Sequence, residues 1–244
     1  GTETLGVVKT TNGGKVWNPV NFGILDLTVL ALAISPDYAT DETVFALTET
    51  GIYRSPNGGK AWRESGTGLE GIVAQCIALS PHFAHERVAF IGTEGHGIFK
   101  SVDGGRRWQQ IAPELRDLSV NAIALSPGFH IDGIALAGTS EGLYLSEDGG
   151  VTWRPVGEER PSILTVAFPP TFVAERLALA GAAEAGVVRS EDAGQSWQPA
   201  NDGLTGRLIV SLVLSPDVSH DQTMFTASLE DGVARSRDGG VTWE

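Results

Sequence analysis

Short apolar segments alternate with polar, glycine-rich turns along the whole 244-residue chain. One class of apolar segment ends at Ser-Pro or Pro-Pro and recurs five times, at residues 29–36, 74–81, 120–127, 163–170 and 209–216. Proline has no N–H to donate, so each segment is predicted to be a strand that stops at its proline. Small residues alternate with large apolar ones in these segments. This pattern predicts strands buried on both faces, innermost among crowded sheets.

The other landmarks between these segments also repeat. A polar loop with one embedded apolar residue follows each predicted first strand, and these residues are Tyr38, Phe83, Phe129, Phe172 and Val218. A second strand, such as 43–47, leads through a short turn to a third, such as 51–55, 97–101 or 142–146. A hairpin then leads to a fourth. Four short strands in about 45 residues are typical of one β-propeller blade.

The hairpin between the third and fourth strands carries an eight-residue motif that ends in tryptophan, which we call the Trp turn. Its six copies occupy residues 10–17, 55–62, 101–108, 146–153, 190–197 and 236–243 and contain all six tryptophans. Asp or Asn at the third position can accept backbone N–H groups, and glycine allows positive φ. We predict that each Trp is buried over its turn with its indole N–H bonded. The residues given this structural role are Asn12, Trp17, Asn57, Trp62, Asp103, Trp108, Asp148, Trp153, Asp192, Trp197, Asp238 and Trp243.

The Trp turns resemble the Asp-box, or BNR repeat, with the consensus Ser-x-Asp-x-Gly-x-Thr-Trp, and the resemblance covers the whole chain. WD40 repeats are excluded because no Trp is followed by Asp. The resemblance implies an all-β propeller of four-stranded antiparallel blades, similar to the bacterial photosystem II stability/assembly factor-like and sialidase-like propeller superfamily. Asn12 and Asn57 replace the acid, and an amide is a poor substitute for a carboxylate ligand. We therefore expect no metal at the turns and no cofactor.

The repeats predict one propeller domain over residues 1–244. Its repeats span 1–28 (partial), 29–73, 74–119, 120–162, 163–208 and 209–244. Third and fourth strands begin six times, whereas first strands occur five times. This count predicts at least six blade positions with the first incomplete, and it leaves seven open. We therefore expect the chain to be a segment of a longer one.

Charge and composition restrict the class of partner. Thirty acidic and 17 basic residues give a net charge of −13, which argues against nucleic acid as a partner. The single cysteine, Cys76, excludes an intrachain disulfide and a cysteine-based zinc site. No apolar run reaches the length of a membrane span, so we expect no membrane insertion. Asp-box proteins are often exported, which implies an extracellular or cell-envelope location. The oligomeric state is left open.

An acidic residue recurs in the short turn between the second and third strands. The series is Glu3, Glu49, Glu94, Glu141, Glu184 and Glu230. On a propeller, these residues would form a ring on one face whose negative field attracts a cation or a basic peptide. The alternative is that they are solvated turn residues. A second series, Asp41, Glu86, Asp132, Glu175 and Asp221, lies in the loop after the first strand, where we expect it to bond loop backbone.

No catalytic residues are predicted. Sialidases require an arginine triad and a nucleophilic tyrosine, but Tyr53, Tyr144 and the arginines at 54, 189 and 235 occupy repeating positions, and a Phe-Arg-Ile-Pro-like segment is absent. Xyloglucanases use two carboxylates across a cleft, whereas the acids considered above all belong to repeating series. The sequence therefore favours a non-catalytic interaction or scaffold module that binds a protein or a glycan through Glu49, Glu94, Glu141, Glu184 and Glu230. A glycoside hydrolase of sialidase or xyloglucanase type is the alternative.

Overall fold

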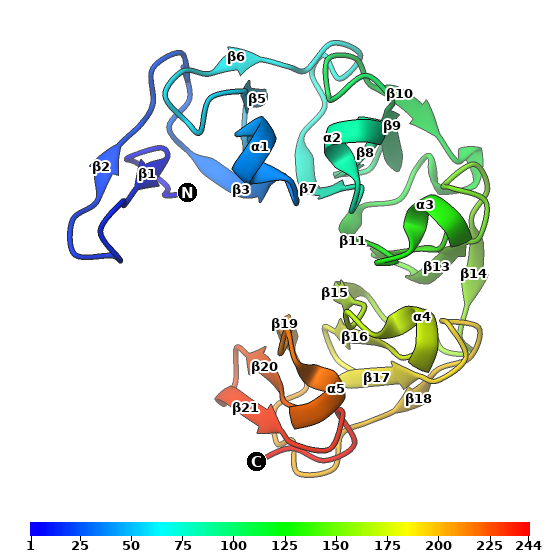
Figure 1. The fold of residues 1–244 in the computed structure, drawn as a ribbon. Helices are drawn as coiled ribbons and strands as arrows, with labels where there is room; N and C mark the ends of the chain where they lie inside the picture. Colours follow the sequence, from blue (N-terminus) through cyan, green and yellow to red (C-terminus); the bar gives the residue numbers. More distant parts are fainter. The chain divides into compact units, whose positions relative to one another are not determined.

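The computed structural model describes residues 1–244 and forms two compact units, Gly1–Asp117 and Leu118–Glu244. Figure 1 shows the elements in chain order, with the strands separated by turns and by five helices of one turn each. None of these helices is long and apolar enough to cross a membrane. Each unit is described by itself.

The first unit contains a two-stranded ribbon and two four-stranded blades, each an antiparallel meander in chain order. The ribbon consists of β1 (Val8–Lys9) and β2 (Asn18–Pro19). Blade A consists of β3 (Val29–Ile34), α1 (Tyr38–Asp41), β4 (Val44–Thr48), β5 (Ile52–Ser55) and β6 (Arg63–Glu64). Blade B consists of β7 (Ala74–Leu79), α2 (Phe83–Glu86), β8 (Ala89–Thr93), β9 (Ile98–Ser101) and β10 (Gln109–Ile111), followed by the 3-10 turn Pro113–Leu115.

The second unit contains three blades with the same order of strands. Blade C consists of β11 (Val120–Leu125), α3 (Phe129–Asp132), β12 (Ala135–Thr139), β13 (Gly142–Ser146) and β14 (Arg154–Val156). Blade D consists of β15 (Ile163–Ala167), α4 (Phe172–Glu175), β16 (Ala178–Ala182), β17 (Val187–Ser190) and β18 (Gln198–Pro199). Blade E consists of β19 (Ile209–Leu214), α5 (Val218–Asp221), β20 (Met224–Ser228) and β21 (Gly232–Ser236).

These sheets confirm the predicted fold class, an all-β propeller with four-stranded antiparallel blades. The blade count differs from the predicted six positions, because the structure has five blades and one ribbon. The ribbon supplies only a third and a fourth strand, and β1 pairs with β2 alone. In blade E, the fourth strand is reduced to Glu244, which exchanges two backbone hydrogen bonds of 2.8 Å with Arg235.

The burial predicted for the first strands is wrong. It is the second strands β4, β8, β12 and β16 that are buried at every position, while the first strands are mostly half-buried and β3 is exposed at alternate positions. Each first strand is the edge of its sheet and pairs on one side only. A second strand is flanked by strands on both sides, so fewer of its atoms reach solvent.

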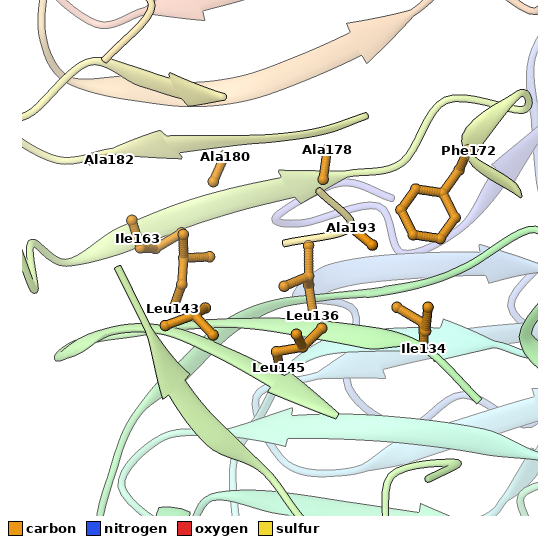
Figure 2. Packing of buried hydrophobic residues seen from close by; sticks show 11 residues of the cluster. Ile134, Leu136, Leu143, Leu145, Ile163, Phe172, Ala178, Ala180, Ala182 and Ala193 are labelled. Carbon is orange, nitrogen blue, oxygen red and sulfur yellow. The ribbon is translucent and has the colours of Figure 1, made fainter. Parts of the chain in front are cut away.

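The core between neighbouring blades is formed by large side chains of one blade and small side chains of the next. Figure 2 shows Leu136 and Leu145 of blade C opposite Ala178 and Ala180 of blade D. Ile163 and Phe172 complete the same buried cluster. The alanines on β16 leave room for the leucines, which lets the two sheets approach closely. Truncating a buried leucine at such a site costs about 2–5 kcal/mol.

The loop after each first strand is one turn of helix rather than an irregular loop. Its acid accepts a hydrogen bond from the serine hydroxyl six residues earlier, at 2.7 Å in Ser35–Asp41 and in Ser126–Asp132. The same acids accept backbone N–H groups, such as that of Thr43 at 2.9 Å. The expectation that this acidic series bonds its own loop is confirmed. Glu175 bonds Thr171 instead, since proline replaces the serine at position 169.

The Trp turns have the hydrogen bonds predicted from their residue types. Ser146 Oγ accepts the Gly150 N–H at 2.9 Å, and Asp148 Oδ1 accepts the N–H groups of Val151 and Thr152, both at 2.9 Å. The same serine contact recurs at residues 55, 101, 190 and 236. The turn chemistry is therefore local, and it does not depend on which blade carries it.

The predicted burial of the tryptophans holds for four of the six. Trp62, Trp108, Trp153 and Trp243 are 3–5% exposed. The indoles of Trp62, Trp108 and Trp243 donate across to the carbonyl of the residue directly after the preceding fourth strand, over distances of 2.6–2.9 Å. For Trp17 the prediction is wrong, because its side chain is 57% exposed. No fourth strand precedes residues 10–17 in the structure, so no carbonyl is offered to its indole. Trp197 is half-buried and bonds Gly194 of its own turn at 3.0 Å.

Candidate functional site

The five predicted site glutamates of the blades all lie in the turn between the second and third strands. These residues, Glu49, Glu94, Glu141, Glu184 and Glu230, are all exposed. A threonine at the end of the second strand braces three of these turns, for example through Thr48 Oγ1 donating to the Gly51 carbonyl at 3.0 Å. The turn is therefore held by its own backbone and threonine, which leaves the glutamate side chain free to point outward.

The structure gives the five glutamates different surroundings. Glu230 Oε2 accepts the N–H groups of Arg207 and Leu208, so this carboxylate braces the loop that precedes β19. Glu94 and Glu141 form hydrogen bonds through their backbone, as when the Glu141 N–H donates to Thr139 Oγ1 at 3.1 Å. Glu49 and Glu94 belong to the first unit and the other three to the second. Nowhere in residues 1–244 do three Asp, Glu, His or Cys side chains come together as a metal ion would need.

A hollow of about 440 Å³ lies beside the Glu49 turn in blade A. It is bounded by Thr50 and Gly51 of that turn and by the loop after β6. Two carboxylates line it, Glu64 from β6 and Glu70 from the loop. A hydrogen bond from the Gly68 N–H to Glu70 Oε1, 3.0 Å long, lowers the pKa of this carboxyl. The hollow therefore presents a deprotonated carboxylate at neutral pH.

The acids of this hollow were missed in the sequence because they belong to neither repeating series. The position of Glu64 is occupied by Pro19, Pro155 and Pro199 in other repeats. Such a departure from the repeat is a usable signal, since a residue that only supports the blade should recur. Comparing the fourth strands position by position would have found Glu64.

A second hollow, of about 310 Å³, lies between blades C and D. It is lined by Val156, Pro161, Trp197 and Pro199, with the amide of Gln195 beside them. Blades A and B, and likewise blades D and E, are joined differently. There the backbone N–H of the Trp donates to a loop carbonyl of the preceding blade, Trp108 to Thr67 and Trp243 to Asp202. Residues 157–161 offer Trp197 no such carbonyl. The half-buried ring therefore remains accessible to an apolar group.

No protein-family model and no curated protein sequence matches the chain. Solved structures with a similar fold were found. An ancestral GH74 enzyme matches at a TM-score of 0.72 with 21% identity, over 88% of this chain and 30% of that chain. The GH74 xyloglucanase from Xanthomonas campestris matches at a TM-score of 0.67 with 18% identity, over 88% of this chain and 37% of that chain.

A structure of YCF48 bound to a D1 peptide is also similar, with a TM-score of 0.69 and 18% identity. This match covers 100% of the present chain and 75% of that chain. The chain thus spans about a third of the length of the GH74 chains but three-quarters of YCF48. At these identities the likeness is one of fold. It is consistent with the propeller blades described above.

Proposed function

We propose that this protein is a non-catalytic Asp-box propeller module that binds a protein partner through the face bearing Glu49, Glu94, Glu141, Glu184 and Glu230. The observation that carries the proposal is the exposure of a glutamate in the turn between the second and third strands of all five blades. An exposed carboxylate that recurs in every blade of a chain with a net charge of −13 favours a basic partner surface. The partner chemistry we propose is a Lys- or Arg-rich segment of another protein.

Two further observations support this proposal. The Trp turns have the hydrogen bonds expected of Asp-box hairpins, so the repeats serve to hold the blades. The match with YCF48 covers 75% of the YCF48 chain, and YCF48 is bound to a D1 peptide in its solved structure. A protein with this fold can therefore bind a peptide. The same proposal locates the protein outside the cell or in the cell envelope, as for other Asp-box proteins.

The proposal is tested by changing the five glutamates to glutamine together. The measurement is capture of partners from a cell extract by immobilised protein, with identification by mass spectrometry. A matched variant carries amides at five other exposed acids, Glu42, Asp117, Glu158, Glu159 and Asp202. We expect the wild type and the matched variant to capture the same partner. The glutamate variant should lose it while keeping its far-UV circular dichroism spectrum.

Salt dependence gives an independent reading of the same variants. Binding through exposed carboxylates weakens as salt screens them, with a Debye length of about 8 Å at 0.15 M. Capture by the wild type should therefore fall steeply between 0.05 and 0.5 M NaCl. Equal capture by the wild type and the glutamate variant at every salt concentration would rule out this face as the binding surface.

A glycoside hydrolase is the second candidate, and the hollow in blade A favours it. Glu64 and Glu70 are carboxylates outside the repeating series, and they line one hollow of about 440 Å³. Two carboxylates that flank a glycosidic bond are the usual requirement for hydrolysis. The similar GH74 structures include a xyloglucanase, although their chains are about three times as long.

The hydrolase candidate is tested by incubating the protein with xyloglucan and with a fluorogenic sialoside. Turnover that is abolished in both Glu64→Gln and Glu70→Gln, but retained in Glu158→Gln, would establish it. If no turnover occurs while the partner is still captured, the interaction module is supported.

A further inference from the structure

Two pockets of the structure occupy equivalent positions in the repeat but differ in charge. One lies between blades A and B and is lined by Arg54, Arg87, Arg106, Asp41 and Asp103. The other lies between blades D and E and is lined by Arg189, Gln222, Glu175, Glu191 and Asp238. Three arginines and two acids give the first lining a charge of +1, whereas one arginine and three acids give the second −2. A positive pocket is unexpected in a chain whose net charge is −13.

Arg54 and Arg189 occupy the same repeat position, the third residue of the third strand or its equivalent, yet only Arg189 is neutralised. Arg189 forms an ion pair with Glu191, and its Nε donates to the Gly239 carbonyl at 3.0 Å. Arg54 has no acid within ion-pair distance, because Pro56 stands where Glu191 stands in blade D. The arginine is therefore ion-paired in the pocket between blades D and E, and the equivalent arginine in the pocket between blades A and B is not.

The guanidinium of Arg54 retains an unused donor inside the pocket region. Its Nη2 donates to Thr43 Oγ1 at 3.3 Å, and its Cζ lies 5.9 Å from the centre of the Phe45 ring. Its Nε is shielded from solvent and has no hydrogen-bond partner. A buried charged donor without a partner is destabilising, because nothing replaces the water that it loses on burial. An anion bound beside this guanidinium would offset the cost of burying its charge.

The two other arginines also lack ion pairs and add to the positive field at Arg54. Neither Arg87 nor Arg106 has a carboxylate within 4.0 Å. Burial lowers the pKa of the Arg54 guanidinium, and the positive charge of Arg106 lowers it further. All three arginines line the same pocket, where a single anion would interact with all of them.

The acids in this pocket form no ion pair with its arginines, although the charge of Asp41 offsets part of the field at Arg54. Asp41 accepts hydrogen bonds from Ser35 Oγ and from the Thr43 N–H, at 2.7 and 2.9 Å. Asp103 Oδ1 accepts the N–H groups of Arg106 and Arg107, at 2.9 and 3.1 Å. Both carboxylates are thus held by their own loops. In the pocket between blades D and E, Glu191 is instead paired with the arginine itself.

We propose that the pocket between blades A and B binds a phosphate-type oxyanion through Arg54, Arg87 and Arg106. Guanidinium groups bind phosphate with paired, charge-assisted N–H bonds, which suits three arginines around one small space. The cavity of about 160 Å³ accommodates the phosphate group itself. The anion is either the free ion or the phosphate of a modified protein, and the chemistry of recognition is the same.

The test uses protein labelled with ¹⁵N-arginine, titrated with inorganic phosphate at constant ionic strength. We expect the Arg54 Nε–Hε resonance to move and to saturate, whereas sodium chloride at equal ionic strength leaves it in place. Pro56→Glu restores the counter-ion found in blade D and keeps all three arginines, so it should weaken phosphate binding at least tenfold. Arg106→Gln should weaken it similarly. The matched control, Arg189→Gln in the pocket between blades D and E, should leave the affinity unchanged.

Folding of each variant is checked by circular dichroism and by its melting temperature, which phosphate should raise in the wild type but not in Pro56→Glu. A phosphoserine peptide that binds at least tenfold more tightly than inorganic phosphate would assign the site to a modified protein, and equal affinity would assign it to the free ion. A resonance that does not saturate, or equal affinity in the wild type and Pro56→Glu, would overturn the proposal.

Discussion

The backbone N–H of Trp108 donates a hydrogen bond of 2.9 Å to the carbonyl of Thr67, which joins blade B to the loop of blade A. Gly68 follows Thr67 with a φ of +95°, and a Cβ at this glycine would lie 2.1 Å from the Trp108 carbonyl oxygen. Gly23 and Gly203 lie against Trp62 and Trp243 in the same manner. A Cβ at these glycines would lie 2.2 and 1.9 Å from the respective Trp carbonyl oxygen. Close approach of two backbones is therefore a shared means of joining blades in both units.

Substituting glycines in this loop should separate backbone strain from steric clash. Gly68→Ala introduces both, and we expect it to lower the free energy of unfolding by about 3 kcal/mol. Gly71 also has a positive φ, +75°, but a Cβ there would meet no atom within 4 Å. Gly71→Ala should therefore lower the free energy of unfolding by only about 1 kcal/mol. Gly66→Ala, with neither feature, should be close to neutral. Urea unfolding measures the series, and equal losses for Gly68→Ala and Gly71→Ala would contradict the clash.

The blade interface predicts different costs for two equivalent phenylalanines. Phe45 of β4 is 0% exposed and lies edge-on to Phe83 at 5.9 Å, whereas Phe225 of β20 is 42% exposed. Phe45→Ala should lower the free energy of unfolding by about 3–5 kcal/mol. Phe225→Ala should cost about 1 kcal/mol, because little apolar area becomes uncovered. The prediction fails if denaturant melts show the two variants to be equally stable.

Tryptophan fluorescence should distinguish Trp17 from the other five. Its side chain is 57% exposed, whereas that of Trp62 is 3% exposed. We expect Trp17→Phe to remove most of the emission that acrylamide quenches and to shift the remaining spectrum to shorter wavelength. Trp62→Phe serves as the control and should leave the quenched fraction almost unchanged. A wild-type spectrum without a quenchable component would show that Trp17 is covered in solution.

Stability should fall in acid because of the aspartates in the Trp turns. Burial tends to raise the pKa of Asp238, but hydrogen bonds from Thr242 and Ser236 outweigh it and lower the pKa from 3.8 to about 2. The folded state thus favours the carboxylate. Its stabilising contribution is present above pH 3.8 and is lost as the pH falls to about 2.

This contribution is measured by urea unfolding between pH 7 and pH 2. Asp238→Asn keeps the turn geometry, since Asn12 and Asn57 occupy the same position in other repeats. The variant should be less stable than the wild type at pH 7 and should lose less stability between pH 4 and pH 2. Parallel curves for the two proteins would show that Asp238 does not contribute through its charge.

Much of the fold could be predicted because it depends on contacts close in sequence. The hydrogen bonds of Asp148 span three to four residues, and that of Ser126 with Asp132 spans six. Strand order follows from the repeat, since each blade is a meander of neighbouring strands. The position of Glu141 in its turn was predicted on the same basis. Its role in binding depends on a partner and remains a proposal.

The features missed in the sequence depend on how loops pack. Glu64 and Glu70 meet in one hollow because the loop after β6 lies beside the strand that carries Glu64, within blade A. Trp197 is half-buried because residues 157–161, in the loop between blades C and D, offer no carbonyl to its backbone N–H. In the sequence, it carries the same motif as Trp243, which is 5% exposed. No pattern within a single repeat could distinguish the two.

The sequence by itself thus determined the propeller blades, the order of their strands and the chemistry of each Trp turn, because these depend on hydrogen bonds and periodicity within one repeat. The tertiary structure decided which equivalent residues are buried, paired or open. Arg54 and Arg189 share one repeat position, yet only Arg189 donates to a carbonyl of the next blade, that of Gly239, whereas the Nε of Arg54 has no partner. The reason is physical: burial and hydrogen bonds between blades depend on what the adjacent blade presents, and this differs from one interface to the next.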